Sequence, residues 1–277
     1  MKGLSVGQWL TRITQTLKES VERPRREAEL LLMAHLDKDQ LWLITHQDAE
    51  VENPEQLEKW VERRALHEPL EYITQRVSFY SQIFHIEPGA LIPRPETELL
   101  IDEVLKRYGS DAEITIAEVG VGSGIISILL AQHLSNAKII AVDISADALK
   151  VARKNIEAFG LSERIALRQG SLLEPVTEKI DLLVSNPPYI ADDAPLERNL
   201  DYEPERALYG GNVGDEIIRE LLDLQRSRHI PVFICEMGYD QKAKVEAYVS
   251  AFALKSLEFY KDLAGFDRGF ILESEHA

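Results

Sequence analysis

A proline-rich tetrapeptide contains the residues best suited to chemistry. The segment Asn186-Pro-Pro-Tyr189 directly follows the mainly apolar run 180–185, which has the composition of a buried strand. Pro187 and Pro188 restrict the backbone and donate no N–H, so the segment offers carbonyl oxygens in a stiff loop. The Asn186 side chain adds another carbonyl, and Tyr189 adds a flat aromatic face. Two acceptors beside an aromatic plane suit a planar –NH2 group, whose nitrogen they would hold and aim.

A glycine-rich turn indicates a second ligand. Gly120-Val-Gly-Ser-Gly124 follows the apolar run 114–119 and precedes an apolar pattern with helical spacing. Glycine allows a tight turn and a close approach of the backbone to a ligand, and the first turn of the following helix presents free N–H groups. A dinucleotide fingerprint would need its third glycine at position 125, which is Ile125, so a nicotinamide or flavin cofactor is disfavoured.

Two carboxylates flank this turn. Glu118 lies at the end of the preceding strand pattern, where it can receive the ammonium group of an amino-acid-like ligand. Asp143 closes the apolar run 138–143, where a carboxylate can accept hydrogen bonds from both hydroxyls of a ribose. A ligand with a ribose and a methionine ammonium group, but no phosphate, is S-adenosylmethionine. The turn and its two carboxylates therefore favour S-adenosylmethionine as the cofactor.

The elements that must position these residues alternate along the chain. Apolar spacing predicts helices near 96–108 and 124–134, and Ser145 can cap a further helix that Gly160 ends. The predicted strands cover 114–119, 138–143, 164–169, 180–185, 231–236, and a terminal pair near 255–261 and 268–274. Alternation of helices and strands predicts a parallel sheet with crossover helices, which is an α/β fold.

The N-terminal part of the chain has a different pattern. Helical stripes begin at Val6 and Pro24, and a third helix is expected after Asn53 and Pro54, which form an N-cap and first-turn pair. These predict a small helical bundle over residues 1–70. The next segment contains β-prone residues and then several prolines, which predicts a hairpin linker over residues 71–95 ahead of the α/β domain at 96–277.

Composition narrows the class of protein further. The chain has 277 residues and a net charge of −16, most of it on residues 96–277, so direct binding to nucleic acid is not expected. The apolar runs are too short to cross a membrane, and no secretory signal is recognised. A single cysteine, Cys235, leaves no intrachain disulfide, which is typical of a cytoplasmic protein. The seven histidines have no metal-ligand spacing, so no metal is expected.

Several segments together resemble one family. Asn-Pro-Pro-Tyr after this type of glycine turn resembles the amino-methyltransferases that modify exocyclic adenine nitrogens or glutamine side-chain amides. The segment Leu91-Ile-Pro-Arg-Pro-Glu-Thr-Glu98 narrows the resemblance to the release-factor glutamine methyltransferases, the HemK/PrmC family. Further matches are Tyr202-Glu-Pro-Glu-Arg-Ala-Leu208, Cys235-Glu-Met-Gly238 and Lys261-Asp-Leu-Ala-Gly-Phe-Asp-Arg268. The resemblance covers residues 70–270.

The resemblance implies a fold and a set of cofactor contacts. The fold would be a Rossmann-like class I methyltransferase sheet with a small N-terminal helical bundle. Asp143 would hold the cofactor ribose, and Asn186 would lie near the reacting nitrogen. The methionine part of the cofactor would be cradled by Gly120, Val121, Gly122, Ser123 and Gly124. At the adenine, Ser171 stands where relatives often have an acidic residue, and Leu172 would pack beside it. Glu118 replaces the more usual Asp and keeps its charge.

The resemblance also implies a substrate and a reaction. A methyl group would pass from S-adenosylmethionine to the side-chain nitrogen (N5) of the glutamine in the Gly-Gly-Gln loop of class 1 peptide chain release factors, which modulates translation termination. Asn186 and the backbone carbonyl of Pro187 would hold the substrate amide. Pro188 and Tyr189 would complete the substrate site, with the Tyr189 ring on the amide plane. The helices of residues 1–70 would help to dock the release factor.

Three alternatives remain open at this point. A glutamine methyltransferase of a ribosomal protein is a close one, although the segment Pro93–Glu98 favours the release-factor type. An adenine-N6 nucleic-acid methyltransferase would use a similar planar amine, and the negative charge of residues 96–277 counts against it. A noncatalytic S-adenosylmethionine-binding module is the third, because Ser171 could weaken cofactor contacts.

Overall fold

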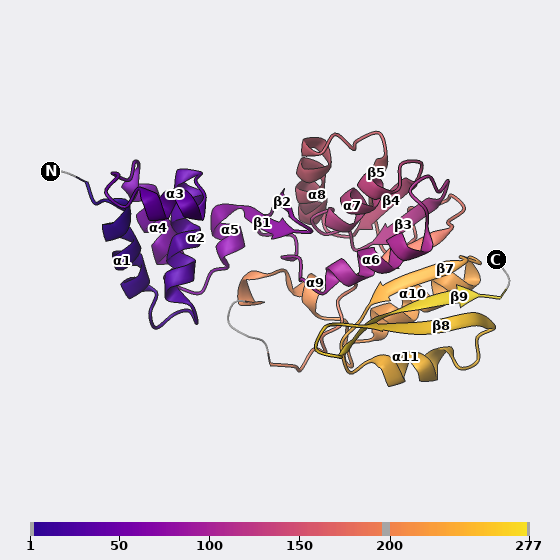
Figure 1. Cartoon of the computed structure of the whole chain (residues 1–277). Coiled ribbons are helices and arrows are strands. Elements are labelled where there is room, and N and C mark those ends of the chain that lie inside the picture. The colour runs from indigo at the N-terminus through magenta and orange to yellow at the C-terminus, as the bar shows by residue number, and fades with distance from the viewer. Residues whose placement is uncertain (1–2, 196–199, 276–277) are drawn as a thin grey trace. The chain divides into compact units, whose positions relative to one another are not determined.

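The computed structural model describes residues 3–195 and 200–275, which form two compact units (Figure 1). Of the described residues, the first unit comprises 3–76 and 200–202, and the second comprises 77–195 and 203–275. The boundary at Arg76 lies within the segment 71–95 that was expected to be a linker. No helix in the described ranges is long and apolar enough to cross a membrane.

The first unit is a bundle of short helices. They are α1 (Val6–Thr16), α2 (Pro24–Leu36), α3 (Gln40–Thr45), α4 (Pro54–Ala65) and α5 (Leu70–Thr74). Their apolar faces meet in one core that includes Trp9, Leu31 and Leu57. The three longer helices begin as the sequence predicted, whereas α3 and α5 are too short to show a period. Asn53 occupies the N-cap position of α4 and Pro54 its first turn, as predicted, but Asn53 has a left-handed conformation and its side chain makes no capping hydrogen bond.

The second unit is built on a seven-stranded sheet of order β5-β4-β3-β6-β7-β9-β8, as the α/β prediction required (Figure 1). The strands are β3 (Thr115–Val119), β4 (Lys138–Asp143), β5 (Ile165–Gln169), β6 (Leu182–Ser185), β7 (Val232–Glu236), β8 (Leu254–Lys261) and β9 (Asp267–Ser274). The first five pair in parallel, and β9 is antiparallel to both β7 and β8. The fold is therefore a mixed, Rossmann-like sheet with an antiparallel edge.

Helices cover both faces of this sheet. The longer ones are α6 (Thr97–Arg107), α7 (Ile125–His133), α8 (Ala146–Ala158), α10 (Glu216–Ser227) and α11 (Lys242–Val249), and the unit also has a single-turn α9 (Glu205–Leu208). The 3-10 turn at Leu200–Tyr202 belongs to the first unit. As predicted, Ser145 caps α8 by accepting a hydrogen bond from the Ala148 N–H. Helices α10 and α11 were not predicted. They pack on the face that carries Ala117 and Cys235, in one apolar cluster.

The strands β1 (Arg76–Phe79) and β2 (Gln82–His85) form a separate hairpin that precedes the seven-stranded sheet in the sequence. Its two-residue turn, Tyr80 and Ser81, has positive φ at both positions (49° and 60°), which matches the twist of a tight hairpin. The hairpin is tied to α8, because the Asn155 side chain accepts from the His85 N–H and donates to the His85 carbonyl. The same side chain donates to the Ser123 carbonyl and so supports the glycine turn.

One arginine holds the loop between α7 and β4. The Arg164 guanidinium donates to the carbonyl oxygens of Ala131, Leu134 and Ala137, at 3.0, 2.5 and 2.9 Å. These carbonyls lie at and beyond the end of α7, where a helix leaves its last carbonyls without partners. Arg164 therefore closes the helix end and fixes the entry into β4, the strand that carries Asp143.

We expect Arg164→Ala to lower the free energy of unfolding of the second unit by about 2 kcal/mol, because partly buried carbonyls lose charged donors. Arg153→Ala removes an exposed arginine from α8 and should change the same quantity by less than about 0.5 kcal/mol. Urea unfolding should be followed by far-ultraviolet circular dichroism, because Trp9, Trp42 and Trp60 all lie in the first unit and their fluorescence does not report on the sheet. Equal effects of the two substitutions would contradict this role of Arg164.

Candidate active site

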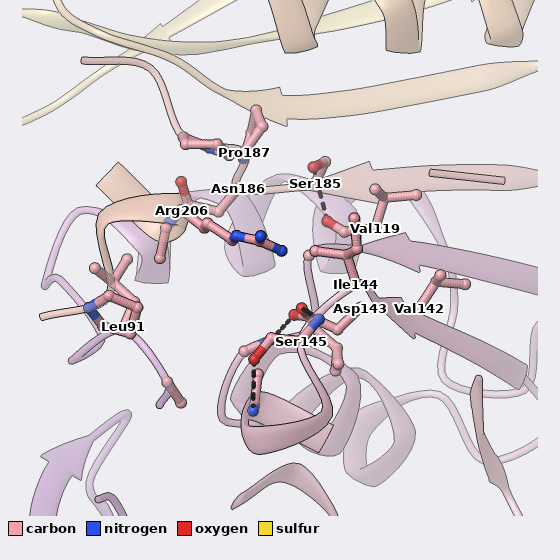
Figure 2. Close-up of a pocket in the computed structure, with 18 of the residues that line it drawn as sticks. Leu91, Val119, Val142, Asp143, Ile144, Ser145, Ser185, Asn186, Pro187 and Arg206 are labelled. Atoms are coloured by element: carbon pink, nitrogen blue, oxygen red, sulfur yellow. Dashed lines mark hydrogen bonds between the residues drawn. The ribbon is translucent and has the colours of Figure 1, made fainter. Parts of the chain in front are cut away.

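A cavity of about 490 Å³ lies within the second unit, at the carboxyl ends of β3, β4 and β6 (Figure 2). Parallel sheets bind ligands at this edge, where the strand order reverses. The loops that follow β3, β4, β5 and β6 line the cavity, together with residues of the segments 89–97 and 204–207. The strand ends bring together Gly120, Asp143 and Asn186, which are far apart in the sequence.

The glycine turn divides into two parts with different roles. Gly120 and Gly122 have positive φ (76° and 53°) and line the cavity with Val121 and Ser123. A Cβ atom at either glycine would meet no atom closer than 3.8 Å, so the backbone there borders open space. Gly124 does not line the cavity, and a Cβ there would lie 3.2 Å from Ala152 of α8. Gly124 thus permits close packing of two helices, while its predicted cofactor contact stays a prediction.

Asp143 ties the glycine turn to the start of α8. Its Oδ2 accepts a hydrogen bond from the Gly122 N–H at 2.9 Å, and its Oδ1 accepts one from the Ser145 N–H at 2.8 Å. Burial raises the pKa of Asp143, and these backbone hydrogen bonds oppose the shift. A carboxylate has additional lone pairs on both oxygens, so Asp143 can still accept hydrogen bonds from a ligand in the cavity.

The Asn-Pro-Pro segment enters the cavity from the end of β6. Asn186, Pro187 and Pro188 all line the cavity, and the Asn186 Nδ2 donates to the Thr97 Oγ1 at 3.1 Å. Ser185, the last residue of β6, is buried and donates to the Val119 carbonyl at 2.8 Å (Figure 2). This hydrogen bond fixes the end of β6 against the end of β3, directly before Asn186.

Tyr189 lies beside the cavity and does not line it. Its ring packs against the apolar cluster of the sheet, and its hydroxyl is 3.4 Å from the Glu236 Oε1. Its carbonyl accepts a hydrogen bond from the Gln241 Nε2 at 3.0 Å. Burial is the main reason that the pKa of Tyr189 is raised, so the phenol stays neutral near neutral pH. Contact between this ring and a substrate amide stays a prediction.

Glu236 is a second buried carboxylate near Asn186. It is the last residue of β7, only 1% exposed, and its Oε2 accepts a hydrogen bond from the Thr97 hydroxyl at 2.7 Å. Burial raises the pKa of Glu236 to about 7, with the hydrogen bond from Thr97 opposing the shift and the charge of Glu96 adding to it. The sequence showed Glu236 only as a carboxylate at the end of a strand, with no indication of a partner on α6.

Glu118 does not line the cavity. It is 1% exposed and its Oε2 accepts a hydrogen bond from the Ser127 hydroxyl of α7, while its Oε1 is buried without a protein partner. Burial raises the pKa of Glu118 to about 8, and hydrogen bonds from Ser127 oppose the shift. The predicted contact between Glu118 and a ligand ammonium group therefore stays a prediction, because Glu118 is not a lining residue, although its Oε1 still lacks a hydrogen-bond donor.

The remaining predicted residues lie on the loop after β5. Ser171 and Leu172 both line the cavity, together with Gly170, whose N–H donates to the Asp143 carbonyl at 3.1 Å. Leu172 has a positive φ of 49°, which is uncommon for a residue other than glycine and often marks a functional loop. The structure thus brings the residue pair 171–172 to the same cavity as Asp143.

Several lining residues were not predicted as site residues, and three of them could contribute to ligand binding. Thr97 lies within the quoted segment 91–98, but its partners come from distant strands. Ile144 follows Asp143 and is 53% exposed, so an apolar side chain faces the open space. Arg206 is the one arginine or lysine in the lining among the residues that the structure describes, and Figure 2 shows its side chain extending toward the strand ends. Arg206 lies within the segment 202–208 that resembles the family, whereas no local pattern distinguished Ile144 from ordinary surface residues.

Solved structures share the fold of the second unit. The hMettl16 catalytic domain in complex with a MAT2A 3′UTR hairpin is 16% identical and covers 70% of this chain and 76% of its own, with a TM-score of 0.57. A 16S rRNA methyltransferase of T. thermophilus in complex with AdoMet and guanosine is 17% identical and covers 72% of this chain and 50% of its own, with a TM-score of 0.53. At these identities the likeness is one of fold.

Sequence comparisons identify the family. Residues 8–74 match the PrmC N-terminal domain and residues 95–200 match the methyltransferase small domain. A release factor glutamine methyltransferase of Moorella thermoacetica is 38% identical over 259 residues, which is 91% of this chain and 92% of the relative. One of Clostridium botulinum is 36% identical over 265 residues, again 91% and 92% of the two chains. The chain belongs to the family of release factor glutamine methyltransferases.

Proposed function

We propose that this protein transfers a methyl group from S-adenosylmethionine to the side-chain amide nitrogen of the glutamine in the Gly-Gly-Gln loop of class 1 peptide chain release factors. The observation that carries the proposal is the meeting of Asn186 and Pro187 with the glycine turn and Asp143 around one cavity. The relatives' names supply the release factor as the substrate. Because this substrate acts in translation termination, the enzyme would act in the cytoplasm.

The cavity fits the proposed cofactor in several respects. Gly120 and Gly122 border open space, so a ligand can lie against their backbone where any side chain would intrude. Asp143 offers carboxylate lone pairs for two ribose hydroxyls, and exposed Ile144 together with Leu172 offers apolar surface for an adenine. Arg206 is a cation available to the carboxylate of the methionine part. When bound, S-adenosylmethionine supplies an electrophilic methyl group.

The protein's own residues would prepare the nucleophile. An amide nitrogen reacts poorly because its lone pair is delocalised into the carbonyl group. The Asn186 Oδ1 and the Pro187 carbonyl would accept the two N–H groups of the substrate amide, which raises electron density on the nitrogen and aims its lone pair at the methyl carbon. No ionised base is needed at the start, because the nitrogen becomes acidic as its new bond forms and can then lose its proton.

We expect Asn186→Ala to lower kcat for methyl transfer roughly 100-fold, because one of the two acceptors that orient the amide is lost. Asn136→Ala changes an exposed asparagine that donates to the Asp111 carbonyl, outside the cavity lining, and should leave kcat unchanged. The assay uses methyl-labelled S-adenosylmethionine with a class 1 release factor and with its loop Gln-to-Ala variant, and mass spectrometry locates the label. The proposed substrate would be rejected if the label appeared at another residue, on a ribosomal protein or on adenine-rich DNA. Binding of the cofactor without any methyl transfer would instead indicate a noncatalytic binding module.

We expect Asp143→Asn to weaken binding of S-adenosylmethionine at least tenfold, about 1.4 kcal/mol. The substitution removes the charge-assisted hydrogen bonds to the ribose. It also places an –NH2 group opposite the N–H donor of Gly122 or of Ser145, which that group cannot accept from. Isothermal titration calorimetry measures the change. Asp147→Asn, which removes an exposed carboxylate paired with Lys150 on α8, is the matched control and should leave the Kd unchanged. A Kd for Asp143→Asn within twofold of the wild-type value would remove Asp143 from the cofactor site.

A further inference from the structure

A continuous hydrogen-bonded chain connects the proposed substrate site to a buried carboxylate. The Asn186 Nδ2 donates to the Thr97 Oγ1 at 3.1 Å, and the Thr97 hydroxyl donates to the Glu236 Oε2 at 2.7 Å. Thr97 is 3% exposed and Glu236 is 1% exposed, so water does not compete for either group. Tyr189 closes the chain at the other carboxylate oxygen, with 3.4 Å between its hydroxyl and the Glu236 Oε1.

The direction in which these hydrogen bonds are donated decides which end of the Asn186 amide faces the cavity. An ionised carboxylate only accepts hydrogen bonds, so the single proton of the Thr97 hydroxyl must point to Glu236. The lone pairs of the Thr97 oxygen are then left for Asn186, and only the Nδ2 end of the amide can donate to them. The two ends of an asparagine amide have nearly the same shape, so this hydrogen bond is what directs the Oδ1 away from Thr97.

We infer that Glu236 and Thr97 are positioning residues, which hold the Asn186 amide with its Oδ1 toward the substrate nitrogen. The inference rests on the proposed function for the identity of that nitrogen, whereas the orientation of Asn186 stands on the hydrogen bonds of the protein alone. The reverse orientation would present an –NH2 group to another –NH2 group, which cannot accept from it. Substrate recognition therefore depends on a carboxylate that need not touch the substrate.

Protonation of Glu236 would reverse the direction of the hydrogen bonds between Glu236, Thr97 and Asn186. A protonated carboxyl can donate to the Thr97 oxygen, and the Thr97 hydroxyl is then free to donate to the Oδ1 of a flipped Asn186 amide. Burial raises the pKa of Glu236 to about 7, so the protonated form gains population as the pH falls through neutrality. The ionised form, present above that pH, is the one that sets the productive orientation.

The groups around Glu236 leave it as the one that titrates in this network. Glu96, at the start of α6, raises its pKa, whereas the hydrogen bond from Tyr189 and the charge of Arg268 on β9 lower it. Cys235 on β7 and Tyr260 on β8 also interact electrostatically with Glu236, and burial raises the pKa of both groups, so they stay neutral near pH 7. Glu118, with a pKa of about 8, titrates in the same range but bonds to Ser127 instead.

The first test compares two substitutions of Thr97. Thr97→Val keeps the shape and removes the hydroxyl, so the Asn186 amide loses its anchor, and we expect kcat for a release factor to fall roughly 10- to 100-fold. Thr97→Ser restores the hydroxyl and should recover most of this loss. The Kd for S-adenosylmethionine should differ by less than threefold between the two variants. Equal kcat values for Thr97→Val and Thr97→Ser would overturn the inference.

The second test follows Asn186 directly in the full chain without any substrate. Asparagine labelled with ¹⁵N gives few side-chain –NH2 signals, and the Asn186 pair is the one absent from Asn186→Ser. We expect this pair to shift with an apparent pKa near 7 in the wild-type protein, and to shift likewise in Glu118→Gln, but to be independent of pH in Glu236→Gln. A titration that persists in Glu236→Gln, or no titration in the wild-type protein, would refute the inference.

The kinetic pH profile links the two tests. In the wild-type protein kcat should rise with pH through about 7, and Glu236→Gln should abolish this inflection. Failure of the proposed function is recognised separately, because a wild-type protein that transfers no methyl group to a release factor would still show the titration of the Asn186 amide. A titration that is present in the spectrum but absent from the kinetic profile of an active enzyme would overturn the role in catalysis.

Discussion

The candidate site depends on the parallel pairing of β3 with two neighbours at once. Val119, the last residue of β3, is in register with Val142 of β4 on one side and with Ser185 of β6 on the other. The residues that follow these three are Gly120, Asp143 and Asn186: Gly120 and Asn186 begin loops, and Asp143 is the last residue of β4. Because parallel strands place their carboxyl ends on one edge, a shift of register by one residue would separate the glycine turn from the carboxylate or the amide that faces it.

Two acidic side chains point from the sheet toward the covering helices, and both are costly to bury. Glu118 faces Ser127 of α7 and Glu236 faces Thr97 of α6, and each side chain is 1% exposed. A buried carboxylate with few partners favours its neutral form, which is why the pKa values of both groups rise toward neutrality. Groups of this kind concentrate at functional sites, and both lie directly beneath the proposed one.

The segments outside the sheet close the cavity from the remaining sides. Glu203 is buried and accepts from the Ile92 N–H and the Arg94 guanidinium, at 3.0 and 2.5 Å. These contacts hold the segment 89–97 against the segment 203–207, and both contribute to the lining. The proline-rich segment that resembles the family therefore has a physical role in this fold, because it builds a wall of the cavity and supplies Thr97 to the end of β7.

Local patterns in the sequence were sufficient for the residues whose role follows from their own neighbours. An apolar run followed by alternating glycines, an aspartate at the end of the next run, and the Asn-Pro-Pro-Tyr segment each occupy the position that the pattern predicted. The predicted strands also agree with the observed order of elements. The signal for a strand is an alternation of apolar residues or a short apolar run, and either depends on only a few adjacent residues. Helices α10 and α11 were missed, although α10 has an apolar stripe and begins directly after Gly214 and Asp215.

Only the tertiary structure decided which polar side chains act together. Thr97 and Glu236 are 139 positions apart, and their hydrogen bond exists because α6 packs on the face of the sheet to which Glu236 points. Other contacts between distant segments act in the same way: Ser127 of α7 donates to Glu118, which does not line the cavity, and the Tyr189 ring packs against the apolar cluster of the sheet. The sequence determined by itself which chemical groups stand at the ends of the strands, since that depends on local backbone preferences. Their partners, burial and direction depend on contacts between distant segments, which local patterns do not encode.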